Sequence, residues 1–195
     1  MSVNAVRIGL KTVPAQRPLR MLSTQELALR LQSAFDQAEG AAGAHCIHEL
    51  WMRGEVPARI ERALQRLWQC AGASIPDWLP MNYVDCLPLL YEVAGRFQGA
   101  ARGRYNLYLV LLDYADRGAG TQGIYVGQSS YPPAARFDQH KAGIRAAGSV
   151  LKRGVEVLTG PVLHLQRLTR AEAARIEAQL AEALQAEGVL VQGGH

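Results

Sequence analysis

One segment of the chain brings together three side chains suited to chemistry at a phosphate. Residues 124–126, Ile-Tyr-Val, are β-branched or aromatic and predict a strand, which Gly127 ends or bends. Pro132-Pro133 then fit the first turn of a helix. Arg136 and His140 follow four residues apart, on one face of that helix. Arginine offers a planar fork of donors, and tyrosine and histidine can move protons, so the segment is a candidate phosphate site.

Basic residues concentrate around this segment. The whole chain has a net charge of +4. From Arg96 to Arg153 there are nine lysines and arginines against three aspartates, Asp113, Asp116 and Asp138, which gives this stretch a charge of +6. Such a distribution favours a polyanionic partner. Surface charges also cluster by chance, so the charge pattern alone leaves the partner open.

The same residues resemble the second half of the GIY-YIG nuclease signature, which runs through Tyr125-Val126-Gly127, Ser129, Arg136 and His140. The first half of that signature is an upstream strand ending in a tyrosine, and Asn106-Leu107-Tyr108 fits this place. The resemblance covers residues 104–195, about half of the chain. It implies an α+β domain with a small, mainly antiparallel sheet flanked by helices.

The resemblance also implies a metal-binding glutamate on a later helix, and Glu177 is the candidate. Thr169-Arg-Ala-Glu172 is a capping box that starts a helix running to Gly188. On that helix Glu177 lies at the margin of the apolar stripe, whereas Glu182 points nearly opposite to it. A carboxylate facing the protein body is costly unless it is paired or metal-bound. A salt bridge with Arg136 is the alternative to a metal.

Hydrolysis of a phosphodiester bond in nucleic acid is the activity that the resemblance implies. DNA is favoured over RNA as the partner, and the sequence leaves open whether the substrate is single-stranded, duplex or branched. One Mg²⁺ (or Mn²⁺) would bind Glu177 and several waters, and Arg136 would neutralise charge on the phosphate. Tyr108 or Tyr125 would take the proton of the attacking water, with help from His140. The sequence leaves open which tyrosine is the base.

Three further residues are candidate contacts to the phosphate backbone, and these are Ser129, Lys141 and Arg153. The chain also departs from the family pattern. Asn106 stands where the first motif has a glycine, and the loop between the two tyrosines is longer than is typical. Many members carry an asparagine after the glutamate, and here Gln192 or His195 would have to replace it.

Composition sets wider limits. The chain has 195 residues, of which 49% are hydrophobic, as in a globular protein with a real core. No apolar run is long enough for a membrane helix, and residues 1–10 lack the apolar core of a signal peptide. Three widely spaced cysteines without a CxxC pair favour a reduced, cytoplasmic location. The oligomeric state is left open.

The sequence divides into three parts. Residues 1–22 lack periodicity and predict a leader or arm. Residues 23–100 predict a mostly helical N-terminal region, which would recognise substrate, a partner or a second protomer. Gly99 to Gly103 predicts a link, although a tightly packed extension is also open. Residues 104–195 form the GIY-YIG-like domain.

Other segments have weaker signals. Residues 161–165 predict a third strand and residues 189–191 a short last one. His45, Cys46 and His48 lie close together but lack the second pair of ligands that a zinc site needs. The three tryptophans, Trp51, Trp68 and Trp78, fit the core, and stacking on bases is the alternative.

Two rival hypotheses compete with an endonuclease. The first is a nucleic-acid-binding protein on the same fold with weak or lost cleavage. The second is an unrelated helical interaction protein, which requires Glu177 to lie far from Arg136.

Overall fold

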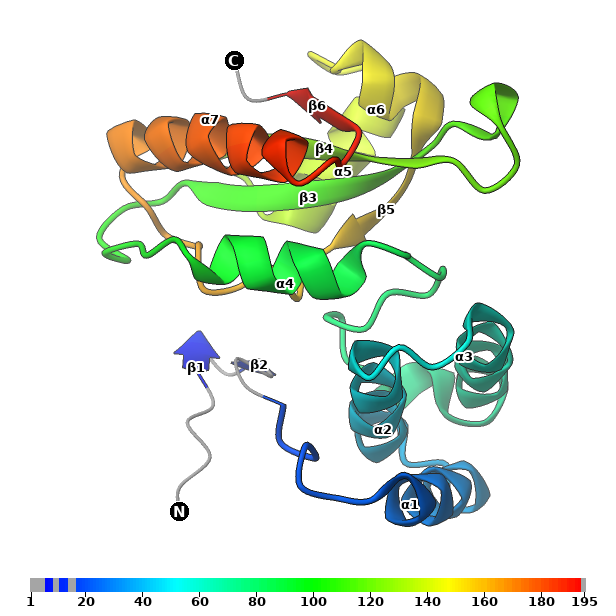
Figure 1. Cartoon of the computed structure of the whole chain (residues 1–195). Coiled ribbons are helices and arrows are strands. Elements are labelled where there is room, and N and C mark those ends of the chain that lie inside the picture. The colour runs from blue at the N-terminus through cyan, green and yellow to red at the C-terminus, as the bar shows by residue number, and fades with distance from the viewer. Residues whose placement is uncertain (1–5, 9–10, 14–16, 194–195) are drawn as a thin grey trace. The chain divides into compact units, whose positions relative to one another are not determined.

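The computed structural model describes residues 6–8, 11–13 and 17–193, and side chains from residue 17 onward. The chain divides into two compact units, Met1–Pro88 and Leu89–His195. The first unit is mostly helical, and the second is an α+β unit built on a four-stranded sheet (Figure 1).

Three helices form the body of the first unit: α1 (Thr24–Asp36), α2 (Gly40–Met52) and α3 (Pro57–Ala71). Ser23 caps α1 in a capping box with Glu26, and Pro57 stands at the start of α3, where a missing N–H costs little. Each helix buries an apolar stripe, with Leu27, Ile47 and Ile60 fully buried. A short 3₁₀ turn, η1 (Gly72–Ser74), follows α3.

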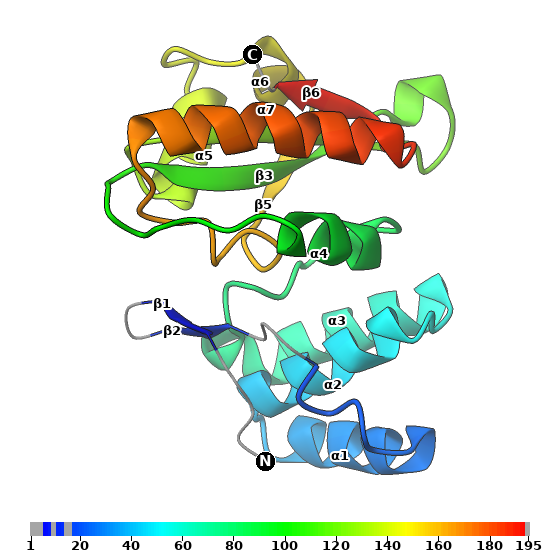
Figure 2. The same cartoon turned by 60° about the vertical axis from the view of Figure 1, so that its left-hand side comes forward.

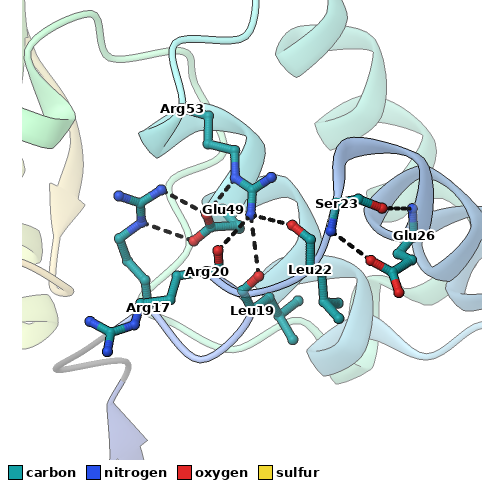
Figure 3. Close-up of polar contacts among 8 residues, drawn as sticks. All are labelled: Arg17, Leu19, Arg20, Leu22, Ser23, Glu26, Glu49 and Arg53. Atoms are coloured by element: carbon teal, nitrogen blue, oxygen red, sulfur yellow. Dashed lines mark hydrogen bonds and ion pairs between the residues drawn. The ribbon is translucent and has the colours of Figure 1, made fainter.

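The segment that precedes α1 is anchored to α2 by a buried carboxylate. Glu49 is 1% exposed and accepts hydrogen bonds from Arg17, at 2.7 and 2.9 Å, and from Arg53, at 2.6 Å. Arg53 also donates to the backbone carbonyls of residues 19, 20 and 22 (Figure 3). Residues 17–22 are therefore held in place, unlike the free arm that the sequence predicted.

Part of the N-terminal segment is also paired. Strands β1 (Val6–Ile8) and β2 (Lys11–Val13) form a two-stranded antiparallel ladder, with Arg7 opposite Thr12. The other residues before Arg17 lie outside the described part of the chain.

Glu49→Gln is expected to destabilise the first unit by about 2 kcal/mol at pH 7, because two arginines lose their partner. This is less than the loss of about 3–5 kcal/mol for fully buried pairs, since Arg17 can be hydrated. Burial raises the pKa of Glu49, but the hydrogen bonds and charges of Arg17 and Arg53 outweigh burial and leave it lowered.

The Glu49 pair therefore stabilises the unit above pH 4.5, the ordinary pKa, and this contribution is lost as pH falls further. Urea unfolding at pH 7 and pH 3 measures both effects. Glu39→Gln, at an exposed carboxylate, is the control. Equal stability of Glu49→Gln and wild type at pH 7 would contradict the prediction.

The second unit contains a sheet with strand order β5-β3-β4-β6. The strands are β3 (Asn106–Asp113), β4 (Gln122–Ser129), β5 (Gly154–Leu158) and β6 (Val191–Gly193). Strand β3 is antiparallel to both β4 and β5, whereas β6 is parallel to β4. The sheet is thus mixed, with antiparallel pairing in its centre, close to the mainly antiparallel sheet that the sequence predicted.

Helices cover both faces of this sheet. Figures 1 and 2 show α7 (Arg170–Ala186) on one face, and α5 (Pro133–Lys141) and α6 (Gly148–Arg153) on the other. Tyr108, Val110 and Leu112 pack with Val150 of α6 and with Phe137 of α5. Alternate residues of β3 therefore point toward α7, because side chains alternate along a strand. Helix α4 (Leu87–Gly95) and the 3₁₀ turn η2 (Ala115–Arg117) complete the elements.

The division into two compact units falls after Pro88, so most of α4 belongs to the second unit, where the carbonyl of Ala94 meets the imidazole of His164 at 3.1 Å. Gly99 and Gly103, at the ends of the expected link, pack closely against Leu168, since a Cβ on either would lie 2.2 Å or less from it. The expected link therefore lies within the second unit.

The expected third strand is also misplaced. Residues 161–165 form turns, although Val162 and Leu165 are buried. The third strand is β5, which precedes this segment and pairs with β3 from Leu109 to Leu112.

Several smaller expectations have clear outcomes. Trp51 and Trp78 are buried, but Trp68 is 57% exposed and does not join the core. All three cysteines are free. Within the described ranges, no group of three or more histidine, cysteine or acidic side chains could hold a metal. No described helix has the length and apolar character needed to cross a membrane.

Candidate active site

Tyr108 and His140 meet inside the second unit. Tyr108 lies on β3 and His140 in the last turn of α5, and both are 1% exposed. The Tyr108 hydroxyl lies 2.9 Å from Nε2 of His140, and the backbone N–H of Ala147 donates to Nδ1 at 2.9 Å. Both nitrogens of the imidazole are therefore engaged.

These two contacts fix the tautomer of His140. A backbone N–H can only donate, so Nδ1 accepts and a neutral imidazole carries its proton on Nε2. Burial, and next the charge of Arg136, lower the His140 pKa to about 4, which keeps the ring neutral at pH 7. His140 thus donates a hydrogen bond to Tyr108. The help from His140 that the resemblance implies is therefore a hydrogen bond donated to Tyr108.

Tyr125 lies beside this pair on the same face of the sheet. Its ring centroid is 5.9 Å from that of Tyr108 and 5.8 Å from that of His140. Gly127, opposite Tyr108 in the register, makes room for both tyrosines. A Cβ at this position would lie 2.5 Å from the Tyr125 ring and 2.7 Å from the Tyr108 hydroxyl. The glycine of the motif is therefore needed for the two rings to sit together.

Hydrogen bonding distinguishes the two tyrosines. Burial raises the pKa of both. Each tyrosine also acts on the pKa of the other: Tyr125 raises the pKa of Tyr108 further, whereas Tyr108 lowers that of Tyr125. The series of hydrogen bonds runs from Ala147 through His140 to Tyr108, and the ring of Tyr125 lies beside it. Tyr125 is the tyrosine better able to carry a negative charge.

Arg136 lies next to the tyrosines, but most of its donors are occupied. Its terminal nitrogens donate to the carbonyls of Ile144 and Arg145, at 3.2 and 2.7 Å, and to the side chain of Gln139 at 3.1 Å. These acceptors carry no net charge, so the positive charge of the guanidinium is not cancelled. It lowers the pKa of Tyr108 and Tyr125 against the larger effect of burial. Arg136 therefore contributes a fixed positive charge at this site, but few free N–H donors.

The edge of β4 near Gln128 is open. Leu107 exchanges its backbone hydrogen bonds with the backbone of Leu165 and the side chain of Gln166, away from β4. Gln128, opposite Leu107, therefore turns its own backbone groups to the other side of β4. Strand β6 runs along that side but pairs only with residues 124–126. The N–H of Gln128 thus points past the paired part of β6.

Glu177 occupies this edge. It is 8% exposed, and both the side chain and the backbone of Gln128 hydrogen-bond to its carboxylate. Burial raises the pKa of Glu177 to about 7, although the two hydrogen bonds oppose the rise. Its charge acts in turn on Tyr125 and raises the pKa of that tyrosine. The carboxylate therefore lies within electrostatic reach of the tyrosine cluster.

The five predicted site residues are only partly brought together. Tyr108, Tyr125, Arg136 and His140 cluster on the face covered by α5, whereas Glu177 comes from α7 on the opposite face (Figures 1 and 2). No ion pair joins Glu177 and Arg136 in the described part of the chain, so the salt bridge considered as an alternative does not form. Both residues act on Tyr125.

The three candidate phosphate contacts have structural partners. Ser129 is buried, and its hydroxyl accepts the N–H of Tyr131 at 3.0 Å. Lys141 donates to the carbonyl of Leu151 within α6 and to that of Gly154, the first residue of β5. These two residues secure the ends of α5.

Arg153 is farther from the site. It pairs with Asp116, donates to the carbonyl of Asp113 and stacks at 4.3 Å over the ring of Tyr114. Asp113 is five residues along β3 from Tyr108, roughly 17 Å at the rise of a strand. Arg153 therefore lies at the other end of the sheet.

Comparison of the chain with models of protein families, with curated proteins and with solved structures finds no match.

Gln128 is the site residue that the sequence reasoning missed. It directly follows Gly127 in the motif strand, which was the only available signal. Its contact with Glu177 depends on where β6 stops pairing. Gln192, one of the expected substitutes for asparagine, instead lies beside Tyr125 in the register. His195, the other, lies outside the described residues.

The tautomer of His140 can be checked directly. We expect long-range ¹H–¹⁵N spectra to show Nε2 protonated and Nδ1 unprotonated from pH 8 down to about pH 5, because the His140 pKa is lowered to about 4. His140 binds a proton near pH 6.5 in the unfolded chain but only near pH 4 in the folded chain. The free energy of unfolding therefore decreases as pH falls from 6.5 to 4. Urea-unfolded protein is the control and should titrate near 6.5. A protonated Nδ1 would contradict the assigned direction of the hydrogen bonds.

Proposed function

We propose that this chain is a metal-dependent endonuclease that hydrolyses phosphodiester bonds in DNA by a GIY-YIG-type mechanism. The observation that carries the proposal is the buried cluster in which Ala147, His140 and Tyr108 are joined by hydrogen bonds, with the ring of Tyr125 beside them and the charges of Arg136 and Glu177 acting on Tyr125. Buried titratable groups with shifted pKa values cluster at functional sites. Glu177 lies on the opposite face of the sheet from Arg136, as the alternative of an unrelated interaction protein would allow, but the charges of both groups act on Tyr125.

Tyr125 is the general base in this proposal. It acts in the phenolate form, after losing its own proton to solvent, and accepts a proton from water as the water oxygen bonds to phosphorus and the bond from phosphorus to the 3′ oxygen breaks. An ordinary tyrosine, with a pKa of about 10, is a poor base at neutral pH. The hydrogen bond from Tyr108 and the charge of Arg136 lower the pKa of Tyr125 against its burial. His140 holds Tyr108 in the donating orientation.

Arg136 stabilises the negative charge that grows on the phosphate oxygens, since its guanidinium is fixed by two backbone carbonyls and needs no rearrangement. Arg104 and Arg145 are exposed and have no ion pair among the described residues, so they offer charge to a nucleic-acid backbone.

The residues at the open edge of β4 fit a hard divalent cation. Glu177 offers carboxylate oxygens, and the buried Oε1 of Gln128 has no hydrogen-bond partner in the described part of the chain. Oxygen ligands suit Mg²⁺ or Mn²⁺. When bound, the ion would stabilise the departing 3′ oxygen as a Lewis acid.

Digestion by the purified full-length chain tests the proposal. Matched single-stranded, duplex and branched DNA and RNA are incubated with Mg²⁺, with Mn²⁺ and with EDTA. We expect metal-dependent cleavage of at least one DNA substrate, and retention of that substrate in a binding assay. Binding without cleavage in either metal would favour the nucleic-acid-binding alternative, and the absence of both would overturn the proposal.

A further inference from the structure

One polar atom close to Glu177 is buried without a partner. Oε1 of Gln128 is shielded from solvent and accepts no hydrogen bond from the described residues. The same side chain, and the backbone N–H of Gln128, hydrogen-bond to the Glu177 carboxylate. Buried carbonyl oxygens nearly always accept a hydrogen bond in folded proteins, because a buried oxygen without a hydrogen bond costs free energy. This oxygen, beside a carboxylate, is therefore available to a water or a cation from outside the described residues.

The side chains at this edge of β4 limit which kind of ligand can bind there. A carboxylate and an amide oxygen lie next to each other on a strand edge that β6 does not cover. Two oxygen donors of this kind attract a hard cation, not a thiolate-seeking metal or an anion. The described residues hold no group of three or more acidic, histidine or cysteine side chains. A site with so few protein ligands suits an ion that keeps most of its water shell, as Mg²⁺ does.

We propose that Gln128 is the second protein group at the divalent-cation site of Glu177. Gln128 has two roles at this site. One end of its amide, together with its backbone N–H, orients the Glu177 carboxylate, and the other end supplies a neutral oxygen for the hydrated ion. This inference rests on the proposed function, because it takes Glu177 as the residue that holds the metal.

Gln128 thus fills the place of the missing asparagine. The sequence offers Gln192 for that part, but the parallel register sets Gln192 beside Tyr125, with its side chain on the tyrosine face of the sheet. Gln128 has its side chain on the face of α7, which carries Glu177. Gln128 therefore connects β4 with α7 through its hydrogen bonds to Glu177.

Binding of Mn²⁺ to the full-length chain, measured by electron paramagnetic resonance without nucleic acid, tests the proposal. Gln128→Leu keeps the size of the side chain but removes its oxygen, and we expect the affinity for Mn²⁺ to fall at least about tenfold. Gln128→Glu adds a carboxylate, so the affinity should rise. Gln192→Leu is the matched control and should bind Mn²⁺ like wild type.

The results separate this inference from the proposed function. If the wild type cleaves DNA but Gln128→Leu and Gln128→Glu both bind Mn²⁺ with wild-type affinity, Gln128 has only a structural role and the inference is overturned. If the wild type neither cleaves nor binds Mn²⁺, the proposed function is overturned and the inference with it. Should Gln128→Leu fail to fold, as judged by its unfolding midpoint, the direction of change in Gln128→Glu decides: tighter binding supports the inference, and unchanged or weaker binding overturns it.

Discussion

Glu177→Ala is expected to reduce DNA cleavage in Mg²⁺ to background while nucleic acid still binds. The substitution removes the carboxylate that would hold the cation, and stabilisation of charge by a metal contributes several kcal/mol to such a reaction, or about a thousandfold in rate. Arg136 and the exposed arginines remain, so binding should persist and become slightly tighter with one negative charge fewer. Single-turnover cleavage and a gel-shift titration measure the two quantities.

Glu182→Ala is the matched control for this experiment. Glu182 lies on the same helix as Glu177 but is exposed, so its removal should change neither rate nor stability. The unfolding midpoint of Glu177→Ala should not fall either, because the carboxylate is buried at a cost that its hydrogen bonds with Gln128 only partly offset. A Glu177→Ala variant that cuts at the wild-type rate would mean that the metal binds elsewhere or that the activity belongs to a contaminant.

Local signals in the sequence predicted the elements of the site well. The capping boxes at Ser23 and Thr169 are both present, and the helix that carries Arg136 and His140 begins at the expected proline. These features depend on interactions within one turn or one strand. A sequence shows them directly, because no distant segment is needed to form them.

Features that depend on distant segments were missed. Glu177 meets Gln128 only because β6 stops pairing with β4 after residue 126, and no local pattern encodes where a parallel strand ends. The third strand was misplaced for a similar reason: residues 161–165 are apolar and buried, but as turns, whereas the less apolar β5 pairs with β3. Burial can be read from composition, but the partner of a strand cannot.

Trp68 shows the same limit in a helix. Ile60, Leu64 and Leu67 on one face of α3 are buried as expected, but Trp68, which the same pattern assigns to the core, is 57% exposed. Helical periodicity gives the direction of a side chain but not the width of the surface that covers it. The edge of an apolar stripe is therefore where such predictions fail.

Tyr125→Phe is expected to lower the cleavage rate by about 10²–10⁴-fold at every pH, because it removes the proposed general base. Tyr108→Phe should behave differently. It removes the donor that lowers the pKa of Tyr125, so its rate should fall at neutral pH and recover as pH rises. In the rate profile this appears as an alkaline shift of the ascending limb.

The control for both variants is Tyr131→Phe, since Tyr131 is 53% exposed and has no part in the cluster. Single-turnover rates between pH 6 and 10, with the enzyme in saturating excess over the DNA and with saturating Mg²⁺, separate the two roles, because a change in substrate affinity then does not enter the rate. A recovery of Tyr125→Phe at high pH, with Tyr108→Phe inactive throughout, would reverse the assignment and make Tyr108 the base. The tautomer of His140 would be the same in that case, because its Nε2–H can donate to a deprotonated Tyr108 while its Nδ1 accepts the N–H of Ala147. The pH profile therefore decides which tyrosine is the base, and the imidazole tautomer does not.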